Sequence, residues 1–252
     1  MLVGRDGPFA TITLNRPEKR NALSLELMRE VTAAVRAVGA SDAPGLIVAA
    51  SGPVFSAGHD FSEMAGADLV AMRQLFAVCT EMMDSLQSIA QPVIARVHGL
   101  ATAAGCQLVA SCDLAVAADT AGFAAPGGKG GLFCHTPMVA IARSVGRKRA
   151  FEIAFTGDVV DAVTAARWGF INRAVPPDQL DEAVIELLDR ACRGSTLSKG
   201  VGKQVLYAQL DLPQAQAYRY AVETMAAATQ THDAQEGIRS FLERRKPDYT
   251  GR

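Results

Sequence analysis

The chain has 252 residues, of which 49% are hydrophobic, and a formal net charge of −1 at pH 7. This length supports one main domain with at most a modest appendage. The balanced charge provides no general attraction to nucleic acid or to an anionic membrane. We therefore expect small molecules and further copies of the same chain as partners.

The sequence carries few signals of compartment or of metal. Its N-terminus meets charge within six residues and has no unbroken apolar run, so we expect no secretory signal. Five cysteines are scattered, mostly among apolar residues, and four histidines are equally dispersed. Neither set has the spacing of a metal motif. We expect reduced thiols, no bound metal and a cytoplasmic location.

Short apolar runs alternate with helical patterns through the first two-thirds of the chain. Ser24 is a favoured N-cap residue and precedes apolar residues at helical spacing, so a helix is predicted after it. Further helices are predicted at 104–111 and 67–89. Strands are predicted by their length and branched residues at 9–14, 45–50, 92–97, 113–118 and 171–175. This alternation predicts an α/β layered core.

The last third of the chain is predicted to be mostly helical. One apolar stripe runs over 180–191 at the spacing of an amphipathic helix. Three more helices are predicted at 199–210, 213–229 and 233–245. A terminal helical block after a compact core favours packing on a neighbouring copy.

Two loops after predicted strands have the features of a binding site. The loop 51–64 contains Ser56, Ala57 and Gly58, small residues that allow a ligand to approach the backbone. The loop 98–107 ends at a predicted helix N-terminus, where free N–H groups favour negative charge. Each loop can therefore give one backbone N–H to a single oxygen, which is the architecture of an oxyanion hole.

Five segments spread from residue 14 to residue 249 resemble the enoyl-CoA hydratase/isomerase (crotonase) superfamily. They occur in the family's order: "LNRPEKRNAL", "FSAGHDFSEM", "VHGLATAAGCQLVASCDLAVAAD", "FTGDVVDAVTAARWGFINRAVP" and "DAQEGIRSFLERRKPDY". The wording "GHD" and "GLFC…TP" is most similar to the branch of enoyl-CoA hydratase domain-containing proteins.

The resemblance implies a fold, an assembly and a ligand. The fold would be α/β, with a crotonase-like spiral of ββα units over 1–195 and a helical C-terminal trimerisation region over 196–252. The assembly would be a homotrimer or a dimer of trimers. The ligand would be an acyl-CoA thioester of fatty acid metabolism, with no cofactor beyond the coenzyme A of the substrate itself.

The resemblance also implies roles for individual residues. The oxyanion-hole N–H groups would belong to His59 and Ala104. Residues that would flank the thioester and pantetheine are Ala57, His59, Asp60, Phe61 and Ser62. Residues that would lie near the CoA nucleotide are Lys19, Arg20, Ala22 and Leu23, and Lys246 would approach the phosphates from the C-terminal end or from a neighbouring subunit.

The two acids of a hydratase are absent from the positions that the resemblance assigns to them. A hydratase holds a water between a base and an acid, each worth about 10²–10⁴ in rate. These positions fall on Gln107 and Gly127. An amide does not exchange protons at neutral pH, so we expect poor or no hydration of short 2-enoyl-CoA. Gln107 itself either serves the helix face or contacts the ligand.

Several side chains remain as candidates for proton transfer. His59 is either a base or acid near pH 7 or a packed histidine. Cys134 and His135 are adjacent in sequence, which rarely gives the geometry of a nucleophile pair. Asp60 and Glu63 are the nearest loop carboxylates, which act as a base or are merely solvated. The segment "GGKGG" at 127–131 lacks the order of a phosphate loop and is predicted to form a flexible rim of the acyl pocket.

Two further functions stay open beside the hydratase/isomerase assignment. The same oxyanion hole supports other enolate chemistry, such as a double-bond shift, decarboxylation or thioester hydrolysis. An acyl-CoA-binding protein without turnover is the non-enzyme alternative. An enzyme exchanges substrate Cα protons or releases CoA, and a binder does neither.

Overall fold

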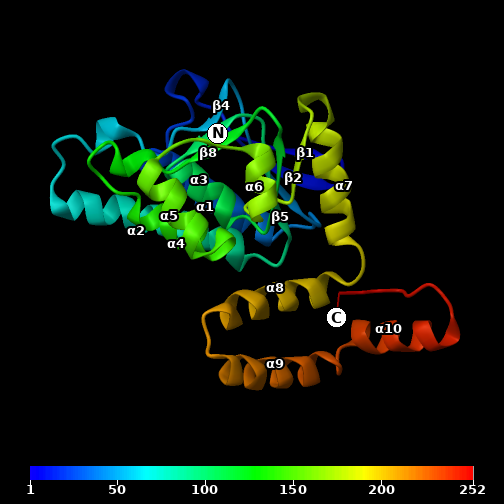
Figure 1. Ribbon diagram of the computed structural model, residues 1–252. Coiled ribbons are helices and arrows are strands. Elements are labelled where there is room, and N and C mark those ends of the chain that lie inside the picture. The colour runs from blue at the N-terminus through cyan, green and yellow to red at the C-terminus, as the bar shows by residue number, and fades with distance from the viewer. Residues whose placement is uncertain (252) are drawn as a thin grey trace.

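A six-stranded sheet runs through the core of the computed structural model, which describes residues 1–251 (Figure 1). The strands are parallel except for the first, which pairs with the second as an antiparallel hairpin. In spatial order they are β1 (Leu2–Asp6), β2 (Phe9–Leu14), β3 (Leu46–Ala50), β5 (Val93–Val97), β7 (Leu114–Ala118) and β10 (Arg173–Val175).

A smaller sheet contains four strands, whose order follows that of β3, β5, β7 and β10 in the main sheet. Its strands are β4 (Val54–Ser56), β6 (Leu100–Thr102), β8 (Gly122–Ala124) and β9 (Val160–Asp161). The chain passes from β3 to β4, from β5 to β6 and from β7 to β8, and each pair is followed by a helix. Each ββα unit is displaced by one strand in both sheets, so the units form a spiral. These helices are α2 (Leu69–Ser88), α3 (Ala104–Ser111) and α4 (His135–Val145).

The main sheet is covered on both faces, which is why β3 is buried along its whole length. Ile47 faces one core cluster with Val184 and Leu188 of α7 (Leu180–Cys192). Leu46 and Val48 face the other cluster, with the apolar sides of α1 (Leu25–Gly39) and α2. The helices α5 (Arg147–Thr156) and α6 (Ala162–Trp168) complete the core near the smaller sheet.

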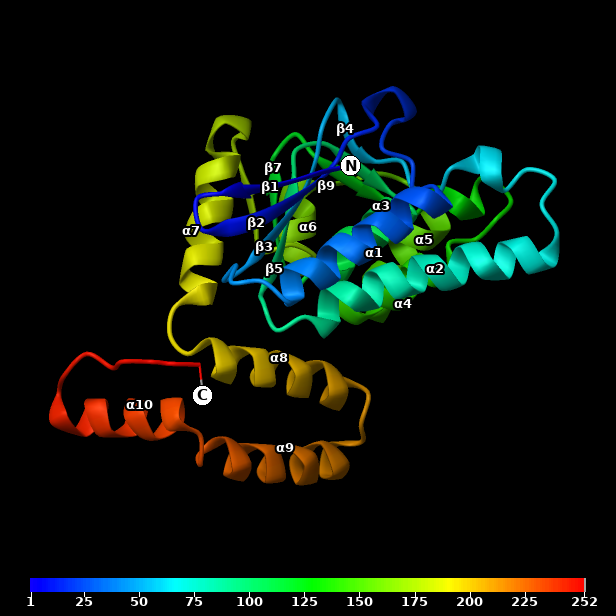
Figure 2. The ribbon, with the colours of Figure 1, turned by 180° about the vertical axis from the view of Figure 1, so that it is seen from behind.

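Three C-terminal helices form an arm that projects from this core in both ribbon views (Figures 1 and 2). They are α8 (Thr196–Leu210), α9 (Gln214–Ala228) and α10 (His232–Glu243). Asp113 fastens α8 to the core, because its carboxylate lies 2.7 Å from the Lys203 ammonium and accepts a 2.8 Å hydrogen bond from the Tyr207 hydroxyl. Helix α9 contains no buried residue.

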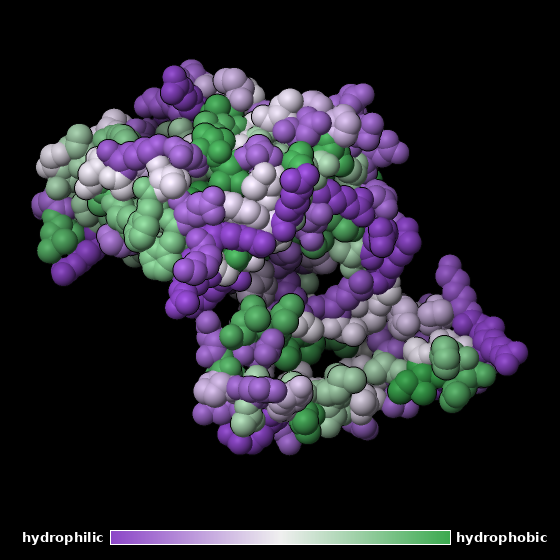
Figure 3. All heavy atoms as spheres, in the orientation of Figure 1, coloured by the Kyte–Doolittle hydropathy of each residue, from purple (hydrophilic) through white to green (hydrophobic). Residues whose placement is uncertain are grey.

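Large apolar side chains of the arm are exposed in the single chain, and Figure 3 shows apolar side chains gathered along it. Phe241 of α10 is 82% exposed. The others are Val201, Leu206, Leu210, Leu212, Tyr218, Tyr220, Val222, Met225, Ile238 and Leu242. The arm therefore has an apolar surface that its own chain does not cover.

The predicted α/β class and the terminal helices are confirmed, and four strands of the smaller sheet were missed. The structure places β4 and β6 inside 51–64 and 98–107, which were expected as loops. Strands of three residues are too short to show an alternating pattern. No helix within residues 1–251 is long and apolar enough to cross a membrane.

Candidate active site

The first loop of the site is held by an isolated parallel bridge between Leu23 and His59. The Leu23 N–H donates to the Gly58 carbonyl at 2.7 Å, and the Leu23 carbonyl accepts from the Asp60 N–H at 3.2 Å. This bridge engages the backbone groups of Gly58 and Asp60, the two neighbours of His59, and leaves the backbone N–H of His59 itself unused. The His59 N–H consequently points away from Leu23.

The second loop turns sharply at Ala103 into helix α3. Ala103 has φ 50° and ψ −118°, a conformation that non-glycine residues rarely adopt, and its N–H donates to the Ala124 carbonyl at 2.9 Å. Such strain costs about 1–3 kcal/mol and persists only where the surroundings impose it. The turn makes Ala104 the first helical residue, with its N–H at the free end of the helix.

The two loops approach each other closely at Gly58. This residue has φ 86°, and a Cβ built on it would lie 3.0 Å from the Ala103 Cβ and 3.2 Å from the Ala104 nitrogen. Only glycine fits both the conformation and the contact. Among residues 1–251 the N–H groups of His59 and Ala104 find no acceptor. Two free donors thus lie on adjoining loops.

Both residues line a cavity of about 670 Å³. The described residues of its lining include no aspartate or glutamate, and most of the surface is apolar. They are Ala57, His59, Phe61, Met64, Phe76, Thr102, Ala103, Ala104, Pro126, Gly127, Lys129, Gly130, Leu132, Phe133, Cys134, His135, Thr136 and Pro137. A cavity of this size and character holds a small apolar ligand group.

His59 is one of the residues that line the cavity. Its ring meets Phe76 edge to face, with the ring centroids 5.4 Å apart. Both ring nitrogens are shielded from water, and neither has a hydrogen-bond partner in residues 1–251. Burial lowers the pKa of this imidazole, and the nearby Leu23 carbonyl opposes the shift more weakly. The ring is therefore neutral at pH 7.

The two carboxylates of the first loop are used to cap local structure, and neither lines the cavity. Asp60 accepts hydrogen bonds from the Ser62 hydroxyl at 2.6 Å and from the Ser62 N–H at 3.1 Å. These bonds, with the nearby cations Lys19 and Arg16, lower the pKa of Asp60. Glu63 accepts a 2.8 Å hydrogen bond from the Leu25 N–H at the start of α1.

The two positions assigned to the hydratase acids differ in their surroundings. Gln107 lies in the first turn of α3, is 5% exposed and is outside the cavity lining, with no partner for Oε1 among residues 1–251. Gly127 belongs to the lining. A Cβ at Gly127 would lie 2.1 Å from the Leu132 carbonyl oxygen and 2.7 Å from the Cys134 sulfur. The loop 127–134 thus closes over the second position.

Cys134 and His135 both line the cavity, as does part of the predicted glycine-rich rim. Burial raises the pKa of the Cys134 thiol, so it is protonated at pH 7. His135 is exposed, and its ring packs against Phe133 with centroids 5.2 Å apart. No hydrogen bond joins Cys134 to His135 in the described part of the chain.

The residues expected near the nucleotide lie beside the first loop, with one exception. The Arg20 carbonyl accepts a 3.0 Å hydrogen bond from the Ala57 N–H, which places 19–23 along 56–60. The side chains of Lys19 and Arg20 are exposed, whereas Ala22 and Leu23 are buried. Lys246 follows α10 in the sequence, and the arm that contains α10 projects away from the core that carries 19–23 (Figure 1).

Asn21 organises this region and was missed by the sequence analysis. It is fully buried with φ 52°, and its side-chain amide donates to the carbonyls of Ser51 at 2.8 Å and Val54 at 3.0 Å. Its side-chain oxygen accepts from the Arg16 N–H at 2.9 Å. An asparagine in a polar loop is a signal for a left-handed turn, but its distant partners are visible only in the fold.

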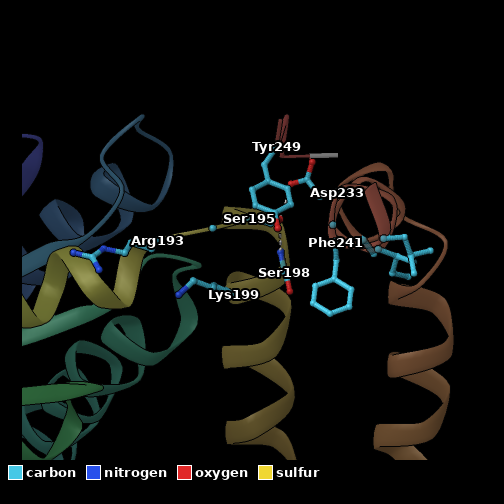
Figure 4. A pocket seen from close by; sticks show the side chains of 12 residues that line it. Arg193, Ser195, Ser198, Lys199, Asp233, Phe241 and Tyr249 are labelled. Atoms are coloured by element: carbon cyan, nitrogen blue, oxygen red, sulfur yellow. Dashed lines mark hydrogen bonds between the residues drawn. The ribbon is translucent and has the colours of Figure 1, made fainter. Parts of the chain in front are cut away.

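A second cavity, of about 560 Å³, lies in the arm between α8 and α10. Ser195 donates a 2.5 Å hydrogen bond to Asp233, and Figure 4 shows Phe241 pointing into the space between the helices. Asp233 also accepts from the N–H groups of Thr250 and Gly251, at 2.7 and 3.0 Å, so it holds the chain end against α8. This cavity is separate from the one lined by His59.

The chain belongs to the enoyl-CoA hydratase/isomerase family, whose model matches residues 5–252. The mitochondrial enoyl-CoA hydratase domain-containing protein 3 of Danio rerio is 42% identical over 98% of this chain and 86% of its own length. An enoyl-CoA hydratase of Mycobacterium smegmatis has a crystal structure with 43% identity and a TM-score of 0.94, covering 98% and 97% of the two chains. The human domain-containing protein 3 gives 39% identity and a TM-score of 0.93, with 98% of each chain covered. These similarities confirm the crotonase fold.

The comparisons overturn one expectation. The prediction of a cytoplasmic location is wrong, because the relatives from Danio rerio and Homo sapiens are named as mitochondrial proteins. Unpaired thiols and a balanced charge do not distinguish one reducing compartment from another. Within residues 1–251 no group of three or more His, Cys, Asp or Glu side chains is placed to hold a metal ion.

Proposed function

We propose that the 670 Å³ cavity binds the acyl group of a CoA thioester, with the thioester oxygen between the N–H groups of His59 and Ala104. The observation that carries the proposal is the pair of free donors on adjoining loops at the wall of an apolar cavity. Each such donor stabilises a developing oxyanion by roughly 3 kcal/mol. The names of the relatives, which are enoyl-CoA hydratases and domain-containing proteins, support the same ligand class.

The rest of the coenzyme A would follow the first loop outward. The exposed Phe61 and Ser62 would flank the pantetheine, beside Ala57 and Asp60. The exposed guanidinium of Arg20 would attract phosphates at the surface, and so would the Lys19 ammonium, which lies 3.7 Å from the Asp60 carboxylate. Ala22 and Leu23 are buried, so they would contribute backbone groups and shape only.

The chemistry that we assign is proton transfer at the carbon next to the thioester, and hydration would be slow. Polarisation of the thioester C=O makes its Cα protons more acidic. Hydration needs two groups to hold and activate a water, and the positions for both are occupied by Gln107 and Gly127. Enolate chemistry, such as a double-bond shift, needs only one proton-transfer group. An acyl-CoA binder without turnover is the alternative, favoured if no Cα proton exchanges.

We further propose that the arm packs on other copies, as a homotrimer or a dimer of trimers. Support comes from the exposed apolar side chains of α8, α9 and α10, which are too numerous for a free surface. In such an assembly Lys246 of one chain would approach the phosphates of a ligand bound to another.

The experiment follows the absorbance of the conjugated thioester when purified protein meets crotonyl-CoA, beside a calorimetric titration with butyryl-CoA. We expect saturable binding of butyryl-CoA, weaker binding of free coenzyme A, and hydration at least about 100-fold below that of a two-carboxylate enzyme. Failure to bind butyryl-CoA would reject the proposed ligand. Rapid loss of the crotonyl band would reject the assigned chemistry.

A further inference from the structure

We propose that the His59 imidazole is the catalytic base and acid of this site, carrying a proton to and from the Cα of the bound thioester. The inference deepens the proposed function and rests on it. It adds a second role for His59, whose backbone N–H is one of the two oxyanion donors.

The other titratable groups of the cavity are poorly placed for this role. The Cys134 thiol is buried and protonated, and its sulfur lies against Gly127. Lys129 is exposed and pairs with Asp158 at 2.6 Å. His135 is exposed to water, and its ring packs against Phe133. His59 differs from them in being an imidazole whose two ring nitrogens are shielded and have no hydrogen-bond partner among residues 1–251.

The loop carboxylates are also unavailable. Asp60 is engaged by Ser62 and lies 3.7 Å from the Lys19 ammonium, and Glu63 caps the start of α1 through the Leu25 N–H. Neither side chain lines the cavity. The His59 imidazole is the remaining candidate for proton transfer.

The geometry of His59 links its ring to the reacting atoms. The same residue supplies the backbone N–H that holds the thioester oxygen and the ring that receives the proton. The distance between these two groups therefore depends only on the side-chain rotamer of His59. The reacting Cα is bonded directly to the carbonyl carbon. Phe76 supports one edge of the ring. Both ring nitrogens are shielded in the structure, so the proposed transfer requires the ring to turn about its second side-chain torsion, which is soft in histidine.

The proposed step conserves atoms and charge. The Cα–H bond breaks, its proton moves to an imidazole nitrogen, and its electron pair forms the C=C bond of an enolate. The negative charge gathers on the thioester oxygen, where the two N–H groups stabilise it. The imidazolium exchanges its N–H proton with solvent and then delivers a proton to Cα, which gives exchange. Delivery to the far end of a conjugated enolate instead shifts the double bond.

The surroundings keep the imidazole in the basic form that this step requires. Burial lowers its pKa below the ordinary value of 6.5, and the Leu23 carbonyl opposes this weakly. The titratable groups that share the cavity are Cys134, His135 and Lys129, and Asp60 is adjacent in the chain. The protonated imidazole cannot act as a base. The rate of exchange is therefore expected to be constant above pH 6.5 and to fall as the pH decreases through the lowered pKa of His59.

The test is deuterium incorporation at the Cα of butyryl-CoA in D₂O, followed by mass spectrometry. The variant His59→Gln keeps the backbone N–H and removes the base, and His59→Asn provides a second variant if the first folds poorly. We expect exchange to fall by about 10²–10⁴-fold. The dissociation constant of butyryl-CoA is expected to change by less than about threefold, because the backbone donor and the cavity remain.

The outcomes separate this inference from the proposed function. Absence of butyryl-CoA binding by the native chain would reject the proposed function itself. Binding without exchange in the native chain would reject His59 as a base while leaving the ligand class standing. Exchange that survives in both His59 variants, or that is lost in His135→Gln instead, would assign the proton to another group and overturn the inference.

Discussion

Gly127 decides, at the scale of a single residue, whether this site can regain a second carboxylate. A Cβ there would lie 2.1 Å from the Leu132 carbonyl oxygen, so any side chain forces the loop 127–134 to move. Overpacking of this kind costs about 1–3 kcal/mol. Steric closure of this loop, in addition to the missing acid, would oppose the hydration of a bound enoyl thioester.

We therefore predict that Gly127→Glu lowers the free energy of unfolding by about 1–3 kcal/mol and that combining it with Gln107→Glu does not restore hydration. Thermal unfolding and the crotonyl-CoA absorbance assay measure the two effects. Gly130→Glu is the matched control for stability, because a Cβ at Gly130 makes only an ordinary 3.6 Å contact with the Gly127 oxygen. A stable double variant that hydrates crotonyl-CoA rapidly would show that the loop 127–134 does not prevent hydration.

The chemistry at the residue scale was only partly predictable from the sequence. The sequence shows directly that Gln107 and Gly127 are not acidic. It does not show where a side chain points, so it leaves Asp60 as a possible base, whereas the structure bonds Asp60 to Ser62. The same holds for Asn21, whose partners lie about 30 residues away in the sequence, at Ser51 and Val54.

At the scale of elements, long periodic segments were predictable and short ones were not. The strand at 9–14 and the helix at 104–111 were predicted with the bounds that the structure has, and Ser24 caps α1 through the Leu27 N–H. The strand β1 was missed because all its residues are exposed and give no apolar pattern. The short strands β4 and β6 were also missed, although their pairing brings the two site loops together.

At the scale of the whole molecule, the arm leaves an apolar surface that a second copy would cover. Phe241 and Leu242 are 82% and 74% exposed on α10. We predict that the native chain sediments as a trimer or larger and that Phe241→Asp with Leu242→Asp shifts it toward smaller species, because a charge at a buried interface is costly. Analytical ultracentrifugation measures this.

Arg239→Glu is the control for that experiment, because it changes the charge of an exposed polar residue on the same helix. It is expected to leave the assembly intact. A native chain that is monomeric at micromolar concentration would show that the arm is covered in some other way. The helices of the arm were predicted from the sequence. Their position relative to the core was not, because it is set by long-range contacts such as that of Lys203 with Asp113.

Isotope-edited infrared spectroscopy of a bound thioester measures whether the N–H groups of His59 and Ala104 hold its oxygen. Butyryl-CoA labelled with ¹³C at the thioester carbonyl would be measured free and bound to the protein. Two donors at the oxygen weaken the C=O bond, so we predict that the carbonyl band moves to lower frequency on binding. A bound ligand whose carbonyl band stays at its position in water or moves to higher frequency would contradict the oxyanion hole.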